Sequence, residues 1–484
     1  MNVRKMISRF SLCALALCAL TVAPTFAQTI THVPLFTFDG DPSVLGINYE
    51  HDRFGGSVSG AGDVDGDGFA DLIVGANGDA NNGANSGSAR VFSGIDGSVL
   101  YTFDGDSTGD FLGSSVSGVG DVNGDGYADL VVGAPCTDGD DGANVGLVRV
   151  LSGVDGSILY DLVGDSALRD LGDSVSDAGD VNGDRVPDLI ASGRGGARIF
   201  SGIDGSVLYN LSVGVTPTVS ASGAGDVNGD GVPDLIVGVP ADSNVGTVIG
   251  NARVFSGVDG SVLYNFVGDS AMDFFGVSVS GAGDVNGDGF ADLIVGAQGS
   301  GSVRVFSGVD GSVLYNFDGD STGDLFGTSV SGAGDVNDDG FDDLIVGSPS
   351  DDNNGSGSGS ARVFSGIDGS VLYTFFGDSN SNQFGRSVSG VGDVNGDGVD
   401  DLIVGAAGVG GVNDTGYARV FVSQIMPNVI LGDVNMDGAV DFFDIQPFID
   451  VLSAQAFQLE ADIDGNGVVD FFDIQPFIDI LSGS

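Results

Sequence analysis

One pattern occurs seven times along the chain, and this repetition limits the possible folds more than any other feature. Most copies begin with an FG-type step, and every copy has segments like SVSGAGDVNGDG, DLIVGA and ARVFSG. Six copies also have a segment like DGSVLY. The apolar pieces are short, rich in Val, Ile and Phe, and bounded by Gly, Asp and Ser, which predicts about four β-strands per copy. The spacing of about 55 residues between copies is typical of propellers and related arrays.

The two ends of the repeated region complement each other. The DGSVLY segment occurs only six times and is missing after the last ARVF, at residues 418–421. The sequence VPLFTFDGD at residues 33–41 matches VLYTFDGD at residues 99–106. We therefore expect the N-terminal strand to complete the last blade, which leaves no open edge between the first and last blades. The predicted fold is an all-β, seven-bladed β-propeller over residues 33–422.

The N-terminus has the features of a secretory signal peptide. Basic residues precede an apolar stretch at residues 12–22, and small residues follow it. We expect residues 1–27 to be removed and the mature protein to be secreted, either extracellular or associated with a cell surface, without membrane insertion. Cys136 is then the only cysteine, so no disulfide within the chain is expected.

Aspartate dominates the charge of the remaining chain. It contains 12 Arg, no Lys and 68 acids, which gives a formal net charge of −56, and 66 of those acids are Asp. Short carboxylates suit tight turns and hard cations. A surface of this charge is a poor partner for nucleic acid or an anionic membrane. The 42% of hydrophobic residues and the apolar runs at fixed intervals argue against disorder.

Each repeat contains a candidate calcium loop. In DVNGDGFAD, which starts at Asp284, oxygen-bearing side chains fall at positions 1, 3, 5 and 9, and the carbonyl of position 7 would add a ligand. Ca²⁺ tolerates such an irregular set of six to eight oxygens, whereas an Asx-turn without metal is the alternative for any one loop. The predicted ligands in the seven loops are Asp63, Asp65, Asp67, Asp71; Asp121, Asn123, Asp125, Asp129; Asp180, Asn182, Asp184, Asp188; Asp226, Asn228, Asp230, Asp234; Asp284, Asn286, Asp288, Asp292; Asp335, Asn337, Asp339, Asp343; and Asp393, Asn395, Asp397, Asp401.

The combined pattern FG…GAGDVNGDG…DLIVGAP resembles the FG-GAP repeat of integrin α-subunit heads and of many exported bacterial proteins. The resemblance covers about 390 residues and implies a seven-bladed propeller with structural calcium sites in the blade loops. Two units depart from the pattern. The fourth lacks an FG step, and the third has Arg185 where the other loops have Gly, so we expect that site to be weak or empty. The cofactor expected is Ca²⁺, six to seven ions in the propeller and two in the C-terminal domain.

Arginine also repeats, once in each ARVF-like strand. Two interpretations are open: a ring that binds a ligand, or pairing with neighbouring Asp residues of the blade. The seven positions are Arg90, Arg149, Arg198, Arg253, Arg304, Arg362 and Arg419.

A different module follows a linker at residues 423–431. Residues 432–484 contain two near-copies, GDVNMDGAVDFFDIQPFIDVLS and ADIDGNGVVDFFDIQPFIDILS, each with a calcium-loop pattern followed by apolar residues at helical spacing. The module resembles a type I dockerin, a small all-α domain with two F-hand calcium loops, which implies docking onto a cohesin-like scaffold or a cell-surface protein. The predicted calcium ligands are Asp433, Asn435, Asp437, Asp441 and Asp444, then Asp462, Asp464, Asn466, Asp470 and Asp473. The candidate docking residues are Phe442, Phe443, Phe471 and Phe472, for which a core between the two halves is the alternative role.

The residues favour binding over catalysis. The mature chain has no Lys or Trp, only His32 and His51, and no G-x-S-x-G motif or P-loop. No single acidic pair stands out from the repeats, and no non-repetitive insertion carries a convincing catalytic side chain. We expect a secreted, non-catalytic, calcium-binding interaction or adhesion propeller, tethered through its C-terminal module, with an unknown protein or glycan ligand. The alternative is a carbohydrate-active, polysaccharide-degrading component of a dockerin–cohesin assembly.

Overall fold

The structure is a computed structural model that describes residues 30–41, 51–139, 144–165, 169–213, 220–241, 249–408 and 415–425. Residues His32–Gln424 form one compact unit. The predicted signal peptide, the linker beyond Ile425 and the whole dockerin-like module, with its calcium ligands and four phenylalanines, lie outside the described residues.

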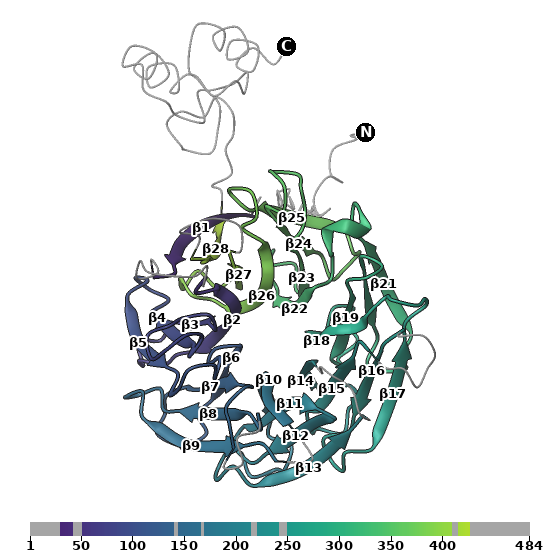
Figure 1. Ribbon diagram of the computed structural model, residues 1–484. Helices are drawn as coiled ribbons and strands as arrows, with labels where there is room; N and C mark the ends of the chain where they lie inside the picture. The colour runs from purple at the N-terminus through teal and green to yellow at the C-terminus, as the bar shows by residue number, and fades with distance from the viewer. Residues whose placement is uncertain are drawn as a thin grey trace, which may run out of the picture. The chain divides into compact units, whose positions relative to one another are not determined.

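The described chain forms seven four-stranded antiparallel sheets, which we call blades 1 to 7 (Figure 1). Each of the first six blades is built from four consecutive strands. Blade 1 contains β2 (Phe54–Gly62), β3 (Asp71–Ala76), β4 (Ser88–Phe92) and β5 (Val99–Asp104); blade 2 contains β6 (Ser115–Gly120), β7 (Asp129–Ala134), β8 (Leu147–Leu151) and β9 (Ile158–Val163); blade 3 contains β10 (Arg169–Gly179), β11 (Asp188–Arg194), β12 (Gly196–Phe200) and β13 (Val207–Ser212).

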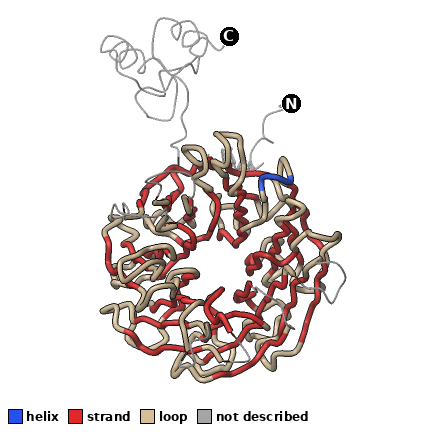
Figure 2. The backbone as a smooth tube through the Cα atoms, viewed as in Figure 1, coloured by secondary structure: helices blue, strands red, loops and turns tan. Residues whose placement is uncertain are grey.

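The same order continues through the second half of the ring. Blade 4 contains β14 (Ser220–Gly225), β15 (Asp234–Val239), β16 (Asn251–Phe255) and β17 (Val262–Val267); blade 5 contains β18 (Phe275–Gly283), β19 (Asp292–Ala297), β20 (Ser302–Phe306) and β21 (Val313–Asp318); blade 6 contains β22 (Ser329–Gly334), β23 (Asp343–Ser348), β24 (Ser360–Phe364) and β25 (Val371–Phe376). Among the described residues, the one helical segment is the short 3-10 turn η2 (Thr322–Asp324), shown in blue in Figure 2.

The closing strand comes from the other end of the chain. Blade 7 contains β26 (Phe384–Gly392), β27 (Asp401–Ala406) and β28 (Tyr417–Ile425), and its fourth strand is β1 (Ile30–Asp39), which lies beside β28 (Figure 1). Arg419 of β28 donates from Nε to Thr37 Oγ1 of β1 at 3.2 Å. Phe38 of β1 stacks on Phe92 of blade 1, with 4.0 Å between ring centroids. The predicted seven-bladed ring, closed by the N-terminal strand, is therefore confirmed.

The hydrophobic core lies between blades. All six residues of each DLIVGA-type segment are buried, and their side chains alternate between the two faces of the sheet. In blade 2, Leu130 and Val132 pack with residues of blade 1, whereas Val131 packs with residues of blade 3. This two-sided burial explains why the second strand of each blade is a continuous apolar run rather than an alternating pattern.

Serine hydroxyls connect the innermost strands into a belt. At the inner edge of an innermost strand, no further strand offers carbonyl acceptors to the backbone N–H groups. Such an edge can pair wrongly with another strand. In every blade, a serine Oγ accepts a hydrogen bond from a backbone N–H of the next blade, at 3.0 to 3.4 Å. The seven serines are Ser57, Ser115, Ser174, Ser220, Ser278, Ser329 and Ser387.

Tyrosines of the outermost strands connect neighbouring blades at the outside of the ring. Tyr160 donates its hydroxyl hydrogen to the carbonyl of Gly202 in blade 3 at 2.7 Å, and Tyr315 donates to Gly366 in blade 6 at 2.6 Å. The closing strand has Phe36 at this place. Its ring lies against Gly97 of blade 1, as the Tyr315 ring lies against Gly369 of blade 6, but it has no hydroxyl.

Phe36→Tyr is expected to stabilise the closure between blades 7 and 1. The new hydroxyl would reach the carbonyl region of the blade 1 hairpin, and one such hydrogen bond contributes about 1 kcal/mol. Chemical denaturation should show this gain in the free energy of unfolding. The matched control is Tyr315→Phe, which should lose about the same amount. A Phe36→Tyr protein of unchanged or lower stability would contradict the assignment.

Candidate metal centres

Each Asp-rich loop connects the first strand of a blade to the second and is held by its own side chains. In the first loop, Asp63 Oδ1 accepts from the N–H of Gly66 at 2.7 Å, and Asp63 Oδ2 accepts from that of Gly68 at 3.0 Å. Asp67 Oδ1 accepts from the N–H of Phe69 at 2.9 Å. Gly68 has φ +93°, a left-handed conformation that favours glycine. The chain therefore folds around the carboxylates at positions 1 and 5.

The aspartate at position 9 is fully buried in every blade. Asp71 accepts from the N–H of Val64 at 2.8 Å and from that of Gly94 at 3.0 Å, so one carboxylate joins its own loop to the hairpin after the third strand. The same hairpin contact, at 2.9 to 3.1 Å, recurs around the ring. The residues with no exposed surface at position 9 are Asp71, Asp129, Asp188, Asp234, Asp292, Asp343 and Asp401.

Burial makes these carboxylates costly to ionise. Desolvation is the main cause that raises each pKa, and hydrogen bonds from backbone N–H groups partly offset it. The pKa rises to about 6 for Asp71, Asp188 and Asp234, to about 7 for Asp292, Asp343 and Asp401, and in the same direction for Asp129. A cation next to these groups would supply the missing compensation.

The donor atoms fit a hard cation. In the first loop, oxygens of Asp63, Asp65 and Asp71 lie within 4.8 Å of one another. Asp292 Oδ2 in the fifth loop and Asn337 Oδ1 in the sixth are buried oxygens with no hydrogen-bond partner among the described residues. Both occupy predicted ligand positions, 9 and 3. Buried polar atoms are usually satisfied, and oxygens at these two positions suit the coordination of a hard cation.

Position 3 is an aspartate in the first loop and an asparagine in the other six. In loops two to five an asparagine occupies this position, and its Nδ2 donates to the position 9 carboxylate at 3.2 to 3.4 Å. Asp65 has no amide to donate, and its pKa is raised, first by desolvation. The loop hydrogen bonds are also those of an Asx-turn, so the loops have internal support besides any metal.

Neighbouring loops contact each other around one face of the ring. The N–H of Ala128 in blade 2 donates to the carbonyl of Asp63 at 3.0 Å. In blades 6 and 7 the residue before position 9 is an aspartate: Asp342 Oδ2 accepts from the N–H of Asp284 at 2.7 Å, and Asp400 Oδ2 accepts from that of Asp335 at 2.9 Å. Sequence reasoning missed these two contacts, although acids at a position elsewhere held by Ala or Pro were the available signal.

Six segments of the chain match the family model of the FG-GAP repeat. The matched residues are 54–92, 112–151, 218–253, 275–315, 326–364 and 384–421. Six of the seven blades thus match the FG-GAP repeat. Blade 3 lies outside these six segments.

The FG-GAP propeller is similar to integrin α-subunits. It is 33% identical over 196 residues to integrin alpha-5 of Xenopus laevis, 29% over 181 residues to integrin alpha-V of Gallus gallus, and 33% over 170 residues to integrin alpha-2 of Bos taurus. The alignments cover 36%, 33% and 31% of this chain, and 18%, 17% and 14% of the integrins. The chain thus aligns with less than a fifth of the length of these relatives.

The third loop of the FG-GAP propeller keeps the common backbone in spite of Arg185. Arg185 has φ +73°, and its N–H donates to Asp180 Oδ2 at 2.7 Å, as Gly68 does to Asp63 in the first loop. A left-handed conformation costs a residue with a side chain about 1 to 2 kcal/mol. The side chain also places a cation beside the predicted site.

Arg185→Gly is expected to raise the free energy of unfolding by about 1 kcal/mol and to strengthen Ca²⁺ binding at the third loop. Calcium titration by calorimetry, together with thermal unfolding in chelator and in Ca²⁺, measures the two effects. Asp338→Gly in the sixth loop is the control, because Asp338 also has a left-handed φ of +57° but carries no positive charge. Equal calcium binding by Arg185→Gly and the unmodified protein would contradict the expected effect of the arginine on the site.

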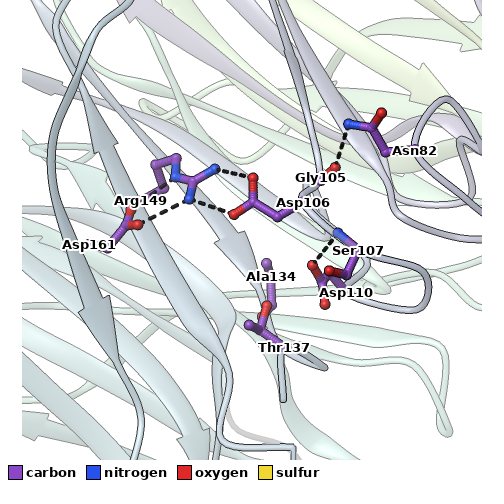
Figure 3. Close-up of polar contacts among 9 residues, drawn as sticks. All are labelled: Asn82, Gly105, Asp106, Ser107, Asp110, Ala134, Thr137, Arg149 and Asp161. Atoms are coloured by element: carbon purple, nitrogen blue, oxygen red, sulfur yellow. Dashed lines mark hydrogen bonds and ion pairs between the residues drawn. The ribbon is translucent and has the colours of Figure 1, made fainter. Parts of the chain in front are cut away.

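The repeated arginines of the FG-GAP propeller pair with aspartates. In six blades the partner comes from the connector that enters the blade, as Asp106 does for Arg149 at 2.8 Å (Figure 3). Arg149 Nε also donates to Asp161 of β9 at 2.9 Å. The other five pairs are Arg90–Asp41, Arg198–Asp165, Arg304–Asp269, Arg362–Asp320 and Arg419–Asp378. In blade 4, Arg253 donates to Asn265 Oδ1 at 3.2 Å. The geometry therefore favours pairing over a ring that binds a ligand.

Proposed function

We propose that the protein is a secreted, non-catalytic interaction or adhesion propeller that binds Ca²⁺ in its blade loops. The observation that carries the proposal is the ring of seven similar Asp loops in an integrin α-like FG-GAP propeller. In each loop, a fully buried aspartate joins the loop to a second part of the same blade. Regular loops in all seven blades suit a stiff binding scaffold.

Calcium would serve structure in this proposal. The carboxylates at positions 1 and 9, with the side-chain oxygens at positions 3 and 5, would hold each ion. The ion would offset the mutual repulsion of these groups and the cost of burying position 9. The protein's own residues already set the loop backbone, so the ion would find its oxygens close to the required arrangement.

The surface of the propeller offers places where a partner or glycan could bind. A pocket of about 410 Å³ lies between the connector that enters blade 2 and the loop after β7, beside the Arg149–Asp106 pair shown in Figure 3. Its lining is mostly polar, with hydroxyl and carboxylate groups and the ring of Phe111. This mixture suits a small polar ligand.

The C-terminal module would tether the propeller. Its duplicated calcium-loop pattern supports docking onto a cohesin-like scaffold or a cell-surface protein, and its four phenylalanines are the proposed contact residues. Across the described residues, no helix has the length and hydrophobicity needed to cross a membrane. The proposed location is extracellular, either free or held at a surface by this module, and the likeness to integrin α-subunits supports it.

The experiment that tests the proposal is a comparison of binding and turnover by the mature full-length protein. The protein would be applied to glycan and protein arrays in Ca²⁺ and in chelator. It would also be incubated with acidic and neutral polysaccharides. We expect binding that depends on Ca²⁺, and no release of sugar. Turnover that survives mutation of each calcium loop, but is lost on mutation of one aspartate outside the repeats, would favour the carbohydrate-active alternative.

A further inference from the structure

Two of the five arginines that the mature chain has outside the repeated set lie at the junction between blades 7 and 1. Arg53 is in the connector that leads into β2, and Arg386 is the third residue of β26. The innermost strands β2 and β26 are neighbours around the ring (Figure 1). Both arginines are at the beginning of their strands, whereas the Asp loops follow the ends of these strands. The pair therefore lies on the face opposite the metal loops.

The backbone around both arginines is fixed. Arg53 has φ +54°, and its carbonyl accepts from the N–H of Gly56 at 2.9 Å in a tight turn. Next to Arg386, Ser387 Oγ accepts from the N–H of Val58 at 3.0 Å, which joins the two strands. The two side chains are thus presented from neighbouring strands that are locked to each other.

Neither guanidinium has an ion-pair or hydrogen-bond partner among the described residues. Arg53 is exposed, and Arg386 keeps exposed surface although its surroundings partly desolvate it. This differs from the arginines of the ARVF-like strands, six of which are paired with aspartate. The pKa of Arg386 is lowered, first by desolvation and then by the positive charge of Arg53. Two unpaired cations that repel each other would gain from a shared anion.

The fold itself does not need arginine at these positions. The place of Arg53 is taken by Phe111, Phe274 and Leu325 in other connectors, each with the same left-handed φ. The place of Arg386 is taken by small or uncharged residues such as Gly56, Ser114 and Thr328 in other blades, and by Asp173 in blade 3. Arginine occurs at both places only where blade 7 meets blade 1, so it changes the surface without changing the backbone.

We propose that Arg53 and Arg386 form a binding site for a small ligand that carries a carboxylate. A guanidinium offers two parallel N–H donors that match the two oxygens of a carboxylate, and two such groups can hold one ligand from both sides. The mature chain has a formal net charge of −56, so a long polyanion would be repelled beyond the reach of this pair. A single carboxylate stays within the local positive field. This inference goes beyond the proposed function and does not depend on it.

The test uses the full mature protein in excess Ca²⁺, with D-galacturonate as the probe and ligand-observed NMR as the measurement. D-galactose is the uncharged comparison. We expect galacturonate to bind and galactose not to bind, and we expect Arg53→Gln and Arg386→Gln each to weaken galacturonate binding about tenfold or more. Arg386→Lys keeps the charge but loses the paired donors, and it should bind with intermediate affinity.

The control is Arg169→Gln, which removes an exposed arginine of β10 in blade 3 and leaves the junction unchanged. It should bind galacturonate as the unmodified protein does, and all four variants should keep its melting temperature. Equal weakening by Arg169→Gln would show a general charge effect and overturn the site. Equal binding of galactose, or displacement of galacturonate by a lower concentration of inorganic phosphate, would overturn the assignment to carboxylate.

Discussion

Removal of Ca²⁺ by a chelator is expected to lower the melting temperature of the propeller by about 10 °C. Each site, with the ion at about ten times its dissociation constant, adds about 1.4 kcal/mol to the free energy of unfolding. Six or seven sites together add about 8 to 10 kcal/mol, and the entropy of unfolding of a unit of this size converts that loss to roughly 10 °C. Thermal unfolding by circular dichroism or calorimetry, before and after chelation, measures the shift.

The control for chelation is the addition of excess Ca²⁺, which should restore the melting temperature and release or absorb heat in a titration. The loss should be larger at low ionic strength, because the carboxylates of neighbouring loops then repel each other more strongly. A melting temperature that is unchanged by chelation, with no heat on adding Ca²⁺ to the treated protein, would contradict calcium binding in the loops.

Asp343→Ala is expected to lower the free energy of unfolding by about 3 to 5 kcal/mol, the largest effect predicted for a single residue. Asp343 is fully buried and accepts hydrogen bonds from the N–H groups of Val336 at 3.1 Å and Gly366 at 3.0 Å. Alanine would leave both donors buried without an acceptor, and each such donor costs about 1 to 3 kcal/mol. Chemical denaturation measures the change.

The control is Asp318→Ala, which removes an exposed aspartate at the end of β21 in blade 5 and should change the stability by less than about 0.5 kcal/mol. Measurement in chelator as well as in Ca²⁺ separates two roles of Asp343. If the loss persists in chelator, the hydrogen bonds cause it; if it occurs only in Ca²⁺, the aspartate acts as a ligand alone. Similar stabilities for Asp343→Ala and Asp318→Ala in both conditions would contradict both roles.

The aspartate at position 9 links the acidic loops to the regular fold. A carboxylate at position 9 must be buried to join the loop to the hairpin, and the short side chain of aspartate reaches both N–H groups from the start of the second strand. Asp71 shows this arrangement in blade 1 and Asp401 shows it in blade 7, where Ser423 replaces the hairpin glycine as the donor. A longer glutamate would displace the strand or the hairpin, which explains why position 9 is Asp in all seven loops.

The sequence by itself determined the number of blades, the strand order and the closure by residues 33–41. These features follow from local patterns, namely the period of the repeat and the short apolar segments. The closure follows from the likeness of residues 33–41 to the outermost strands, in which Phe36 takes the place of the tyrosine. The left-handed position of Arg185 could also be predicted, because glycine occupies it in the other loops. The calcium ligands, the signal peptide and the dockerin-like module stay predictions.

Only the tertiary structure decided the contacts between blades. The serine belt, the tyrosine hydroxyls, the pairing of Arg149 with Asp106 and the contact of Asp342 with the fifth loop each join residues of neighbouring repeats. A repeat shows which residues recur, but the packing of one blade on the next sets which recurring residues meet. That packing depends on the twist and closure of the whole ring. The sequence alone therefore does not show that Arg53 and Arg386 come to the same junction, where blade 7 contacts blade 1.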